Sequence, residues 1–440
     1  MQNISSLRNL GVIALLLVVV AVQIITQQFF PLTETLHWHF PFQLPFTSAQ
    51  IYLFNRIFQA LAFLVFLGLI ALMESREQIR PKLYAVLAGI ALVGAFVAAL
   101  TNLASPDCFY YIGHGRKLAI LHLSPYTPLA DVRTDEIIRM IPEKWLSLPS
   151  LYGPTAVIFF GFLNVISPPT MPALLLTFKL AWFGMFLLFS VFLYRMLKHY
   201  RYTYTRWFAF CANPVTWHLC LRDAHVEMMM VLFILFCLMA AIKRKWLACG
   251  IALGLLCTTK IIMLIIAPFF AIHILRDTLK TPQWRQRKHN LLLFLLGFLG
   301  YVIPAYAIFN GGELFGLLDF YSTHDTSFFF IPWIILKFSE ATGIGYPVND
   351  PVAFAHISSE IILLSGLCGM FIHACRARIP LNLAAASGIA MMFFIFTVTY
   401  QFAWYILWGI VFLIIAVPTL KEVFLLAAFY TLFGTFDNPY

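Results

Sequence analysis

The sequence predicts an all-α fold, namely a polytopic transmembrane helical bundle of about 13 spans. Two observations support this prediction. Of the 440 residues, 61% are hydrophobic and only 11% are charged, which is too few charges for the surface of a soluble domain. Apolar runs near the roughly 20 residues that cross a bilayer also recur from one end of the chain to the other. We therefore expect one integral membrane domain over residues 1–440.

The predicted spans are apolar runs bounded by charge clusters, glycines or prolines. They lie at about 9–28, 51–73, 83–103, 171–197, 206–222, 226–242, 246–259, 261–276, 290–309, 351–374, 382–400, 403–419 and 422–437. The first run lacks a small-residue cleavage site, so we expect it to be a retained span rather than a signal peptide.

The net charge of +10 arises from basic clusters that lie between the apolar runs. This placement indicates membrane orientation rather than nucleic-acid binding, because short loops rich in Lys and Arg stay cytoplasmic. If the spans alternate, the clusters fall on one side. They are Arg8, Arg76, Arg80, Lys82, Lys198, Arg201, Arg206, Lys243, Arg244, Lys245, Arg276, Lys280, Arg285, Arg287, Lys288, Arg376 and Arg378. The N-terminus is then predicted inside, and residues 104–153 outside.

Several breaks in the apolar pattern carry more information than the regular spans. Residues 154–168 are too short to cross a bilayer and predict a re-entrant or interfacial helix. Two short helices are expected to meet at Thr258-Thr259-Lys260, and Asn213-Pro214 interrupts another span. Polar backbone at membrane depth survives only where protein or a water-filled cavity surrounds it. We therefore expect an exterior cavity, roofed by the loops 104–153 and 310–350.

Asp107 is the first candidate catalytic residue. It follows directly on the predicted span 83–103, where it would be partly withdrawn from water. A carboxylate in that position suits a general base that takes the proton of a hydroxyl group. The alternative is an aspartate that only shapes a helix end or turn beside Pro106.

Basic residues on the predicted outer side are the second clue, since positive charge there runs against the usual preference and suggests an anionic ligand such as a phosphate. They are Arg116, Lys117, Arg133, Arg139, Lys144, Arg222 and Lys260. For three of them, Arg133, Arg139 and Lys144, pairing with nearby acids on a surface helix is the favoured interpretation. The acids are Asp131, Asp135, Glu136 and Glu143. Lys260 stands alone between two apolar half-helices, which favours a functional role.

Two further polar groups stay open to two interpretations each. In the run from Arg222 to Glu227, the simple interpretation of Arg222 and Asp223 is a salt bridge. His225 and Glu227 line the cavity or merely solvate a helix end. His324, next to Asp325, is an auxiliary base or an inert loop histidine.

The aromatic run from Phe402 to Trp408, which contains Trp404 and Tyr405, is either a membrane-interface anchor or a wall against which a sugar stacks or a polyprenyl chain lies. No metal site is predicted, because the spacing of His225 and Glu227 matches no recognised ligand pattern and the chain has no D-x-D-like acidic cluster.

These motifs together resemble a known family. The elements, in chain order, are Asp107-x-x-Tyr110-Tyr111, Gly115-Arg116, Ser124-Pro125-Tyr126-Thr127-Pro128, Tyr152-Gly153-Pro154, Asn213-Pro214 with Ala224-His225-Val226-Glu227, Thr258-Thr259-Lys260, and Phe402 to Trp408. The pattern, which spans roughly residues 100–410, resembles that of GT-C glycosyltransferases, especially polyprenol-phosphate-mannose-dependent mannosyltransferases. The chain departs from it at Ser124 for Asn, Val226-Glu227 for Asn-Asp, and Ala403 for Pro.

The resemblance implies a GT-C fold and a reaction. That reaction is the inverting transfer of a hexose, with mannose expected, from a polyprenyl-phosphate donor to an extracytoplasmic glycan or glycolipid, without nucleotide, metal or other cofactor. Asp107 would be the base, with His324 as its rival, and Lys260 or Arg116 would meet the donor phosphate. Substrate contacts are expected from Tyr110, Tyr111, Arg116, Tyr126, Tyr152, Arg222, His225, Glu227, Lys260, Trp404 and Tyr405. The expected location is the bacterial cytoplasmic membrane, with the site on its outer side.

The rival interpretation is a transporter or a flippase for lipids or lipid-linked sugars. It predicts an inverted repeat and ionisable groups at the membrane midplane. The sequence shows no convincing repeat, and the candidate polar groups gather at one predicted face. The enzyme is therefore the favoured interpretation.

Overall fold

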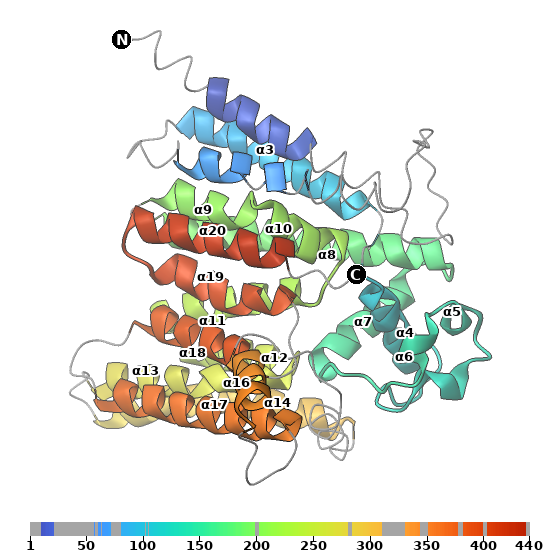
Figure 1. Ribbon diagram of the computed structural model, residues 1–440. Coiled ribbons are helices and arrows are strands. Elements are labelled where there is room, and N and C mark those ends of the chain that lie inside the picture. Colours follow the sequence, from blue (N-terminus) through green and yellow to red (C-terminus); the bar gives the residue numbers. More distant parts are fainter. Residues whose placement is uncertain are drawn as a thin grey trace. The chain divides into compact units, whose positions relative to one another are not determined.

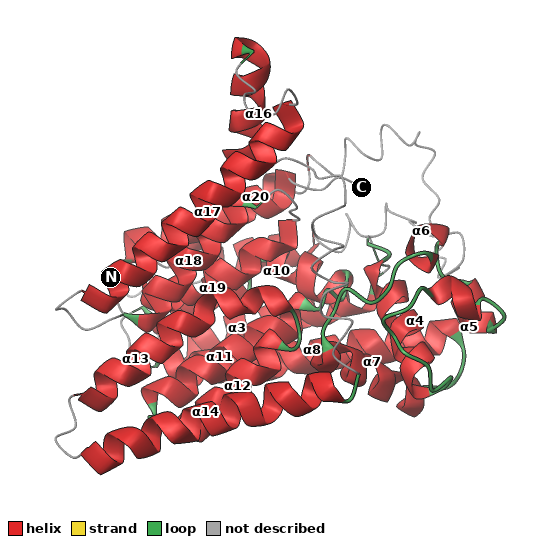
Figure 2. Cartoon of the chain, turned by 90° about the horizontal axis from the view of Figure 1, so that it is seen from below, coloured by secondary structure: helices red, strands yellow, loops and turns green. Residues whose placement is uncertain are grey.

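The computed structural model describes the chain as helices joined by loops (Figure 2). The described residues are 10–21, 57, 60–62, 64–71, 81–101, 103, 105–198, 202–279, 284–309, 331–343, 351–376, 382–398 and 403–436. Over these ranges every regular element is helical, which agrees with the predicted all-α class.

The helices are named as in Figure 1. They are α3 (Pro81–Leu100), α4 (Asp107–Ala119), η1 (Leu129–Val132), α5 (Glu136–Arg139), α6 (Glu143–Leu146), α7 (Pro154–Ile166), α8 (Met171–Leu197), α9 (Thr203–Cys211), α10 (Pro214–Thr216), η2 (Trp217–Arg222), α11 (Glu227–Ile242), α12 (Trp246–Cys257), η3 (Ile261–Ile266), α13 (Ala267–Leu279), α14 (Trp284–Ala307), α16 (Ile331–Thr342), α17 (Pro351–Arg376), α18 (Leu383–Thr397), η4 (Ala403–Tyr405), α19 (Ile406–Ala416) and α20 (Leu420–Phe436).

Several helices are apolar enough and long enough to cross a membrane. Within the described ranges there are four such helices, namely α3 from Lys82, α8, α14 from Lys288, and α17. The segments Pro214–Arg222 and Glu227–Ile242 are bent by 111° relative to each other, and they make a fifth span if they are counted as one broken helix. The chain is therefore a membrane protein with several spanning helices. The count of about 13 spans stays a prediction.

The breaks predicted from the sequence are confirmed as helix ends. Helix α7 has only 13 residues. Helix α12 ends at Cys257, and η3 begins at Ile261, so the chain turns at Thr258-Thr259-Lys260. Asn213 caps α10, since its side-chain oxygen accepts a hydrogen bond from the Val215 N–H at 2.9 Å. The loop 310–350, which includes His324, lies mostly outside the described residues.

The chain divides into two compact units, and each is described by itself. The first contains Met1–Ser150, Val157–Leu232 and Val417–Tyr440, and the second contains Leu151–Ala156 and Phe233–Ala416. In the first unit, α4, α5, α6 and most of α7 lie together (Figure 1). Helix α3 packs against η2 and α8.

An aromatic stack forms the core of the first unit around the start of α4. The Tyr111 ring stacks on Phe160 of α7, with centroids 4.8 Å apart, and Phe178 of α8 stacks on Trp182 at 5.8 Å. All four rings are fully buried. Gly115 permits the close approach of α4 to α7, because a Cβ there would lie 2.5 Å from the Phe160 carbonyl carbon. The N-terminal half of α4 is therefore held rigidly.

Small residues bring α12 and α14 together in the second unit. A Cβ on Gly250 would lie 2.2 Å from the Phe294 carbonyl oxygen, and one on Gly297 would lie 2.3 Å from that of Leu247. Close backbone packing of this kind is typical of membrane helices. Lipid tails are as apolar as the helix surface, so the hydrophobic effect does not drive such helices together, and close packing does. Helices α18 and α19 pack together in the same unit, as do α16 and α17.

Candidate functional site

Asp107 is the first residue of α4 and is 7% exposed. Its backbone N–H donates a hydrogen bond to the Ser105 hydroxyl at 3.3 Å. The N-terminus of a helix carries a partial positive charge, which favours a carboxylate at this position. A buried carboxylate needs such compensation, because its removal from water costs several kcal/mol.

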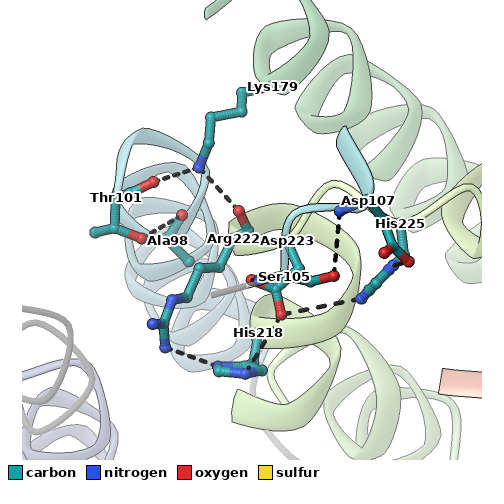
Figure 3. A network of polar contacts seen from close by, with 9 residues as sticks. All are labelled: Ala98, Thr101, Ser105, Asp107, Lys179, His218, Arg222, Asp223 and His225. Carbon is teal, nitrogen blue, oxygen red and sulfur yellow. Dashed lines mark hydrogen bonds and ion pairs between the residues drawn. The ribbon is translucent and has the colours of Figure 1, made fainter. Parts of the chain in front are cut away.

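A chain of carboxylates and imidazoles begins at this carboxylate (Figure 3). Asp107 Oδ2 lies 3.3 Å from His225 Nδ1. The other ring nitrogen, Nε2, lies 4.0 Å from Oδ2 of Asp223. That same oxygen lies 3.5 Å from Nε2 of His218, whose Nδ1 is 3.2 Å from the Arg222 guanidinium. None of these five residues is more than 14% exposed.

Local backbone geometry presents Asp223 and His225 to Asp107. Residues Trp217–Arg222 form a π-helix, a rare conformation that is frequent at functional sites. Ala224 then adopts a positive φ of 51°, which costs a non-glycine residue about 1 kcal/mol or more. The reversal allows the side chains on both sides of Ala224 to face α4.

Two side chains of α8 fix this turn through its carbonyl groups. The Lys179 ammonium donates hydrogen bonds to the carbonyl oxygens of Thr101, at the end of α3, and of Arg222, the latter at 2.9 Å. The Trp182 indole N–H donates to the carbonyl oxygen of His225. A cation at the carbonyl ends of two helical segments is electrostatically favourable. The backbone on either side of the turn is thus anchored to one rigid helix.

Other predicted contact residues of the first unit lie on or near α4. The Tyr110 hydroxyl donates to the Pro149 carbonyl oxygen at 2.5 Å, and Tyr111 is fully buried in the aromatic stack. Glu227 is fully buried in the first turn of α11. Tyr126 is partly exposed in the loop before η1, with its backbone N–H bonded to the Ser124 hydroxyl at 3.3 Å.

Two basic side chains of α4 hold the loop that follows it. Arg116 Nε donates to Asp135 at 2.8 Å. Although burial alone would raise the pKa of the Asp135 carboxyl, the Arg116 hydrogen bond and two backbone N–H groups lower it. The Lys117 ammonium, only 1% exposed, donates to the carbonyl oxygens of Thr127 and Pro128 at 2.9 and 2.8 Å. Burial lowers the pKa of Lys117. Both cations are therefore part of the loop structure.

The surface pairing expected for Arg133 is observed. Its guanidinium lies 2.9 Å from the Glu143 carboxylate, and both side chains are more than half exposed. Exposed pairs of this kind contribute at most about 1 kcal/mol.

Lys260 lies in the second unit and is surrounded by aromatic rings. Its ammonium is 4.1 Å from the centroid of Tyr405, 4.8 Å from that of Trp408 and 5.6 Å from that of Tyr152. The residue is only 4% exposed. Cation–π contacts are worth about 0.5–2 kcal/mol each, most where water is excluded. We refer to Lys260, Tyr152, Tyr405 and Trp408 as the lysine cage.

The segment Tyr152-Gly153-Pro154 reaches the cage by pairing with the end of α12. The last carbonyl groups of a helix lack partners within it. Here the Gly153 N–H donates to the Thr259 carbonyl oxygen at 3.0 Å, and the Thr155 N–H donates to that of Thr258 at 3.1 Å. Pro154, between them, has no N–H to satisfy. The hydroxyl groups of Thr155 and Thr258 also hydrogen-bond to each other at 2.6 Å.

The aromatic run at 402–408 supplies one wall of the cage. Tyr405 and Trp408 are stacked, with centroids 4.3 Å apart, and Trp404 packs edge-on against Tyr405 at 6.4 Å. All three residues are buried.

His324, the rival base, lies outside the described residues. Within the described part of the chain, no three His, Cys, Asp or Glu side chains are placed to hold a metal ion. The absence of a metal or other cofactor from the reaction stays a prediction.

Sequence reasoning missed His218, Ser105 and Lys179, and it assigned Asp223 only a pairing with Arg222. One signal was present, because the run from Trp217 to Glu227 holds five ionisable side chains in an otherwise apolar stretch. Ionisable residues in such a stretch mark candidate sites by default.

Comparison with known proteins bears on the reaction. No curated protein and no solved structure shows significant similarity to the chain. The family model described as the alpha-(1->6)-mannopyranosyltransferase N-terminal domain matches residues 8–276, which is more than half of the sequence and includes Asp107, the His225 turn and Lys260. The chain therefore belongs to this mannosyltransferase family, which supports mannosyl transfer by a membrane-embedded glycosyltransferase.

Proposed function

We propose that the protein transfers mannose from a polyprenyl-phosphate donor to a hydroxyl group of an extracytoplasmic glycan or glycolipid, with inversion at the sugar. Family membership supports the mannosyl group. The observation that carries the mechanism is the buried Asp107 carboxylate, placed at a helix N-terminus and 3.3 Å from an imidazole. The helix N-terminus favours the charged form of Asp107, as a protonated imidazole does, and a general base requires that form.

The reaction balances as a single displacement. Asp107 accepts the proton of the acceptor hydroxyl while the hydroxyl oxygen forms a bond to C1 of the mannose. The bond between C1 and the phosphate oxygen breaks on the opposite face, and polyprenyl phosphate leaves with the electron pair. A donor already joined to a lipid phosphate needs no nucleotide. The proton ends on Asp107 and is released to water.

The leaving phosphate requires a cation, and Lys260 is the stronger of the two candidates. Arg116 is engaged with Asp135 at 2.8 Å, and its release would cost that carboxylate its charge-assisted hydrogen bond. Lys260 carries its charge in an apolar, aromatic setting, where an anion would be bound more strongly than in water. The rings of Tyr405 and Tyr152 offer faces for the sugar or for the first isoprene units.

The base assignment is tested by Asp107→Asn in purified protein with a synthetic polyprenyl-phosphate mannose. The amide keeps the shape but cannot take the proton, so kcat should fall by roughly 10² to 10⁴ while donor binding persists. Glu143→Gln, on an exposed carboxylate of the same loop, is the matched control and should leave kcat unchanged. Glu227→Gln and His324→Ala test the rival bases. Near-normal turnover of Asp107→Asn, with loss in one of the rivals, would move the base to that rival.

The outward orientation is tested by labelling. Cysteines introduced in the loops 104–153 and 310–350 should react with an impermeant thiol reagent in intact cells. The exposed native residues Cys368 and Cys375 are first replaced by serine, because they would react themselves. Reaction only after permeabilisation would place the loop in the cytoplasm, where a lipid-linked donor with an outward headgroup is out of reach.

A further inference from the structure

We propose that His225 is a positioning residue that, together with Asp223, holds Asp107 charged and correctly oriented for catalysis. The inference rests on the proposed role of Asp107 as the base. It assigns functions to two residues of the turn after η2 and accounts for the unusual backbone there.

A ring of contacts surrounds Asp107. Asp223 Oδ1 accepts the Ser105 N–H at 3.2 Å, and the Ser105 hydroxyl accepts the Asp107 N–H at 3.3 Å. The Asp107 carboxylate meets His225 at 3.3 Å. One short turn therefore grips Asp107 at two points, by its carboxylate and by the backbone that precedes it (Figure 3). Such a grip fixes both the position and the direction of the carboxylate, which a productive base needs.

The charges around His225 support the same role. Acidic groups face His225 from three elements, namely Asp107 of α4, Asp223 of its own loop and Glu227 of α11. Ionised carboxylates only accept hydrogen bonds, so an imidazole between two of them is best satisfied with protons on both nitrogens. The resulting cation favours the charged form of Asp107. On the far side of Asp223, His218 provides a second imidazole contact at 3.5 Å.

The backbone of this turn is energetically unfavourable, which also supports the proposal. The positive φ of Ala224 costs free energy, and a π-helix precedes it. A histidine that only filled the core would need neither feature. Here the reversal places the residues before and after Ala224 on the same side, toward Asp107. Trp182 then fixes the carbonyl group of His225.

A double-mutant cycle tests the proposal. The variant His225→Asn keeps a neutral N–H donor close to the position of Nδ1, whereas His225→Leu removes the donor. Against native Asp107, His225→Asn should lower kcat roughly tenfold and His225→Leu roughly a hundredfold. Against Asp107→Asn, both should change kcat by less than about twofold, because residues that act through one group are not additive. An equal loss in both backgrounds would overturn the positioning role.

The pH profile of kcat/KM provides a second, independent readout. A carboxylate that loses a neighbouring cation takes up its proton at higher pH. In His225→Asn, the acid-side fall in activity should therefore shift to higher pH. A role in folding alone would lower activity without this shift, and an unshifted profile refutes the proposal. The exposed His373, replaced by Gln, serves as the histidine control.

The experiments distinguish failure of the Asp107 assignment from failure of the His225 assignment. If Asp107→Asn keeps near-normal turnover, the assignment of the base is wrong. If Asp107→Asn is strongly impaired but the cycle is additive, only the role of His225 is wrong. The thermal unfolding midpoint of each variant shows whether it folds. If His225→Leu does not fold, His225→Asn is used for both the double-mutant cycle and the pH profile.

Discussion

Gly153→Ala should detach the Tyr152-Gly153-Pro154 segment from the end of α12. An alanine Cβ would lie 2.2 Å from the Thr258 carbonyl oxygen and 2.8 Å from its carbon. Both are backbone atoms of a helix end and cannot rotate away. The segment must therefore move, and movement breaks the hydrogen bonds from Gly153 to Thr259 and from Thr155 to Thr258, of 3.0 and 3.1 Å.

The magnitude follows from these contacts. Overpacking of a well-packed site costs about 1–3 kcal/mol. Each lost hydrogen bond adds about 1 kcal/mol. We expect a total destabilisation of about 3–5 kcal/mol, seen as a lower midpoint of thermal unfolding of the purified protein in detergent. Mannosyl transfer should fall as well, because Tyr152 would leave the lysine cage.

The matched control is Gly300→Ala in α14. A Cβ at that position has no atom within 4 Å, and alanine in a helix interior is favoured over glycine by about 0.5–1 kcal/mol. Gly300→Ala should therefore leave the midpoint unchanged or raise it slightly. If Gly153→Ala behaves like Gly300→Ala, the pairing between the segment and α12 does not carry the stability assigned to it.

Two further predictions concern charge. Lys260→Met should raise the KM for the lipid-phosphate donor roughly ten- to hundredfold, since a charge-assisted contact is worth about 1.5–3 kcal/mol; the exposed Lys421→Met is the control, and unchanged donor kinetics would assign Lys260 a structural role. Burial, aided by the charge of Lys117, lowers the pKa of His114 to about 3. The unfolded chain binds a proton at His114 below about pH 6.5 while the folded chain does not, so stability is full above that pH and falls by about 1.4 kcal/mol per pH unit toward the folded pKa. At pH 5, wild type should have lost about 2 kcal/mol relative to His114→Gln, and parallel stability curves for the two proteins would contradict this.

The sequence predicted the helix breaks well, because their causes are local. Asn213 is a good N-cap, and the proline after it fits the first position of a helix. At Thr258-Thr259-Lys260, both threonine hydroxyls bond back to the preceding turn of α12, Thr258 to Gly254 and Thr259 to Leu255, each at 2.7 Å. Side chains that compete with the helix in this way mark its end.

The ends of α18 and α19 in the second unit were less predictable than the helix breaks. The runs 382–400 and 403–419 were expected as spans, but α18 has 15 residues and α19 has 11. A hydropathy window measures apolar content and does not detect where a helix ends within an apolar run. Short helices surrounded by protein satisfy the same window as spanning ones.

The network around Asp107 depends on contacts that the sequence does not encode locally. Asp107 and His225 were each singled out, yet their pairing joins residues more than a hundred positions apart. His225 follows Asp223 through Ala224, which takes a positive φ although it is not a glycine, so the sequence gives no sign of this turn. His218 was hidden because one histidine within an apolar helix is usually a core residue. Its significance follows only from the π-helix, which sets it beside Asp223.

Lys260 raises a different physical question, namely why a buried site holds a lysine. It lies between the C-terminus of α12 and the N-terminus of η3, whose partial charges are opposite in sign and largely cancel at this residue. The faces of three rings lie against this charge. A methionine of similar length would pack against the same rings without the cost of removing an ammonium from water. Ring packing by itself therefore does not favour lysine over methionine, whereas the lipid phosphate that we propose as donor would. Comparison of folding and donor affinity in Lys260→Met separates these two contributions.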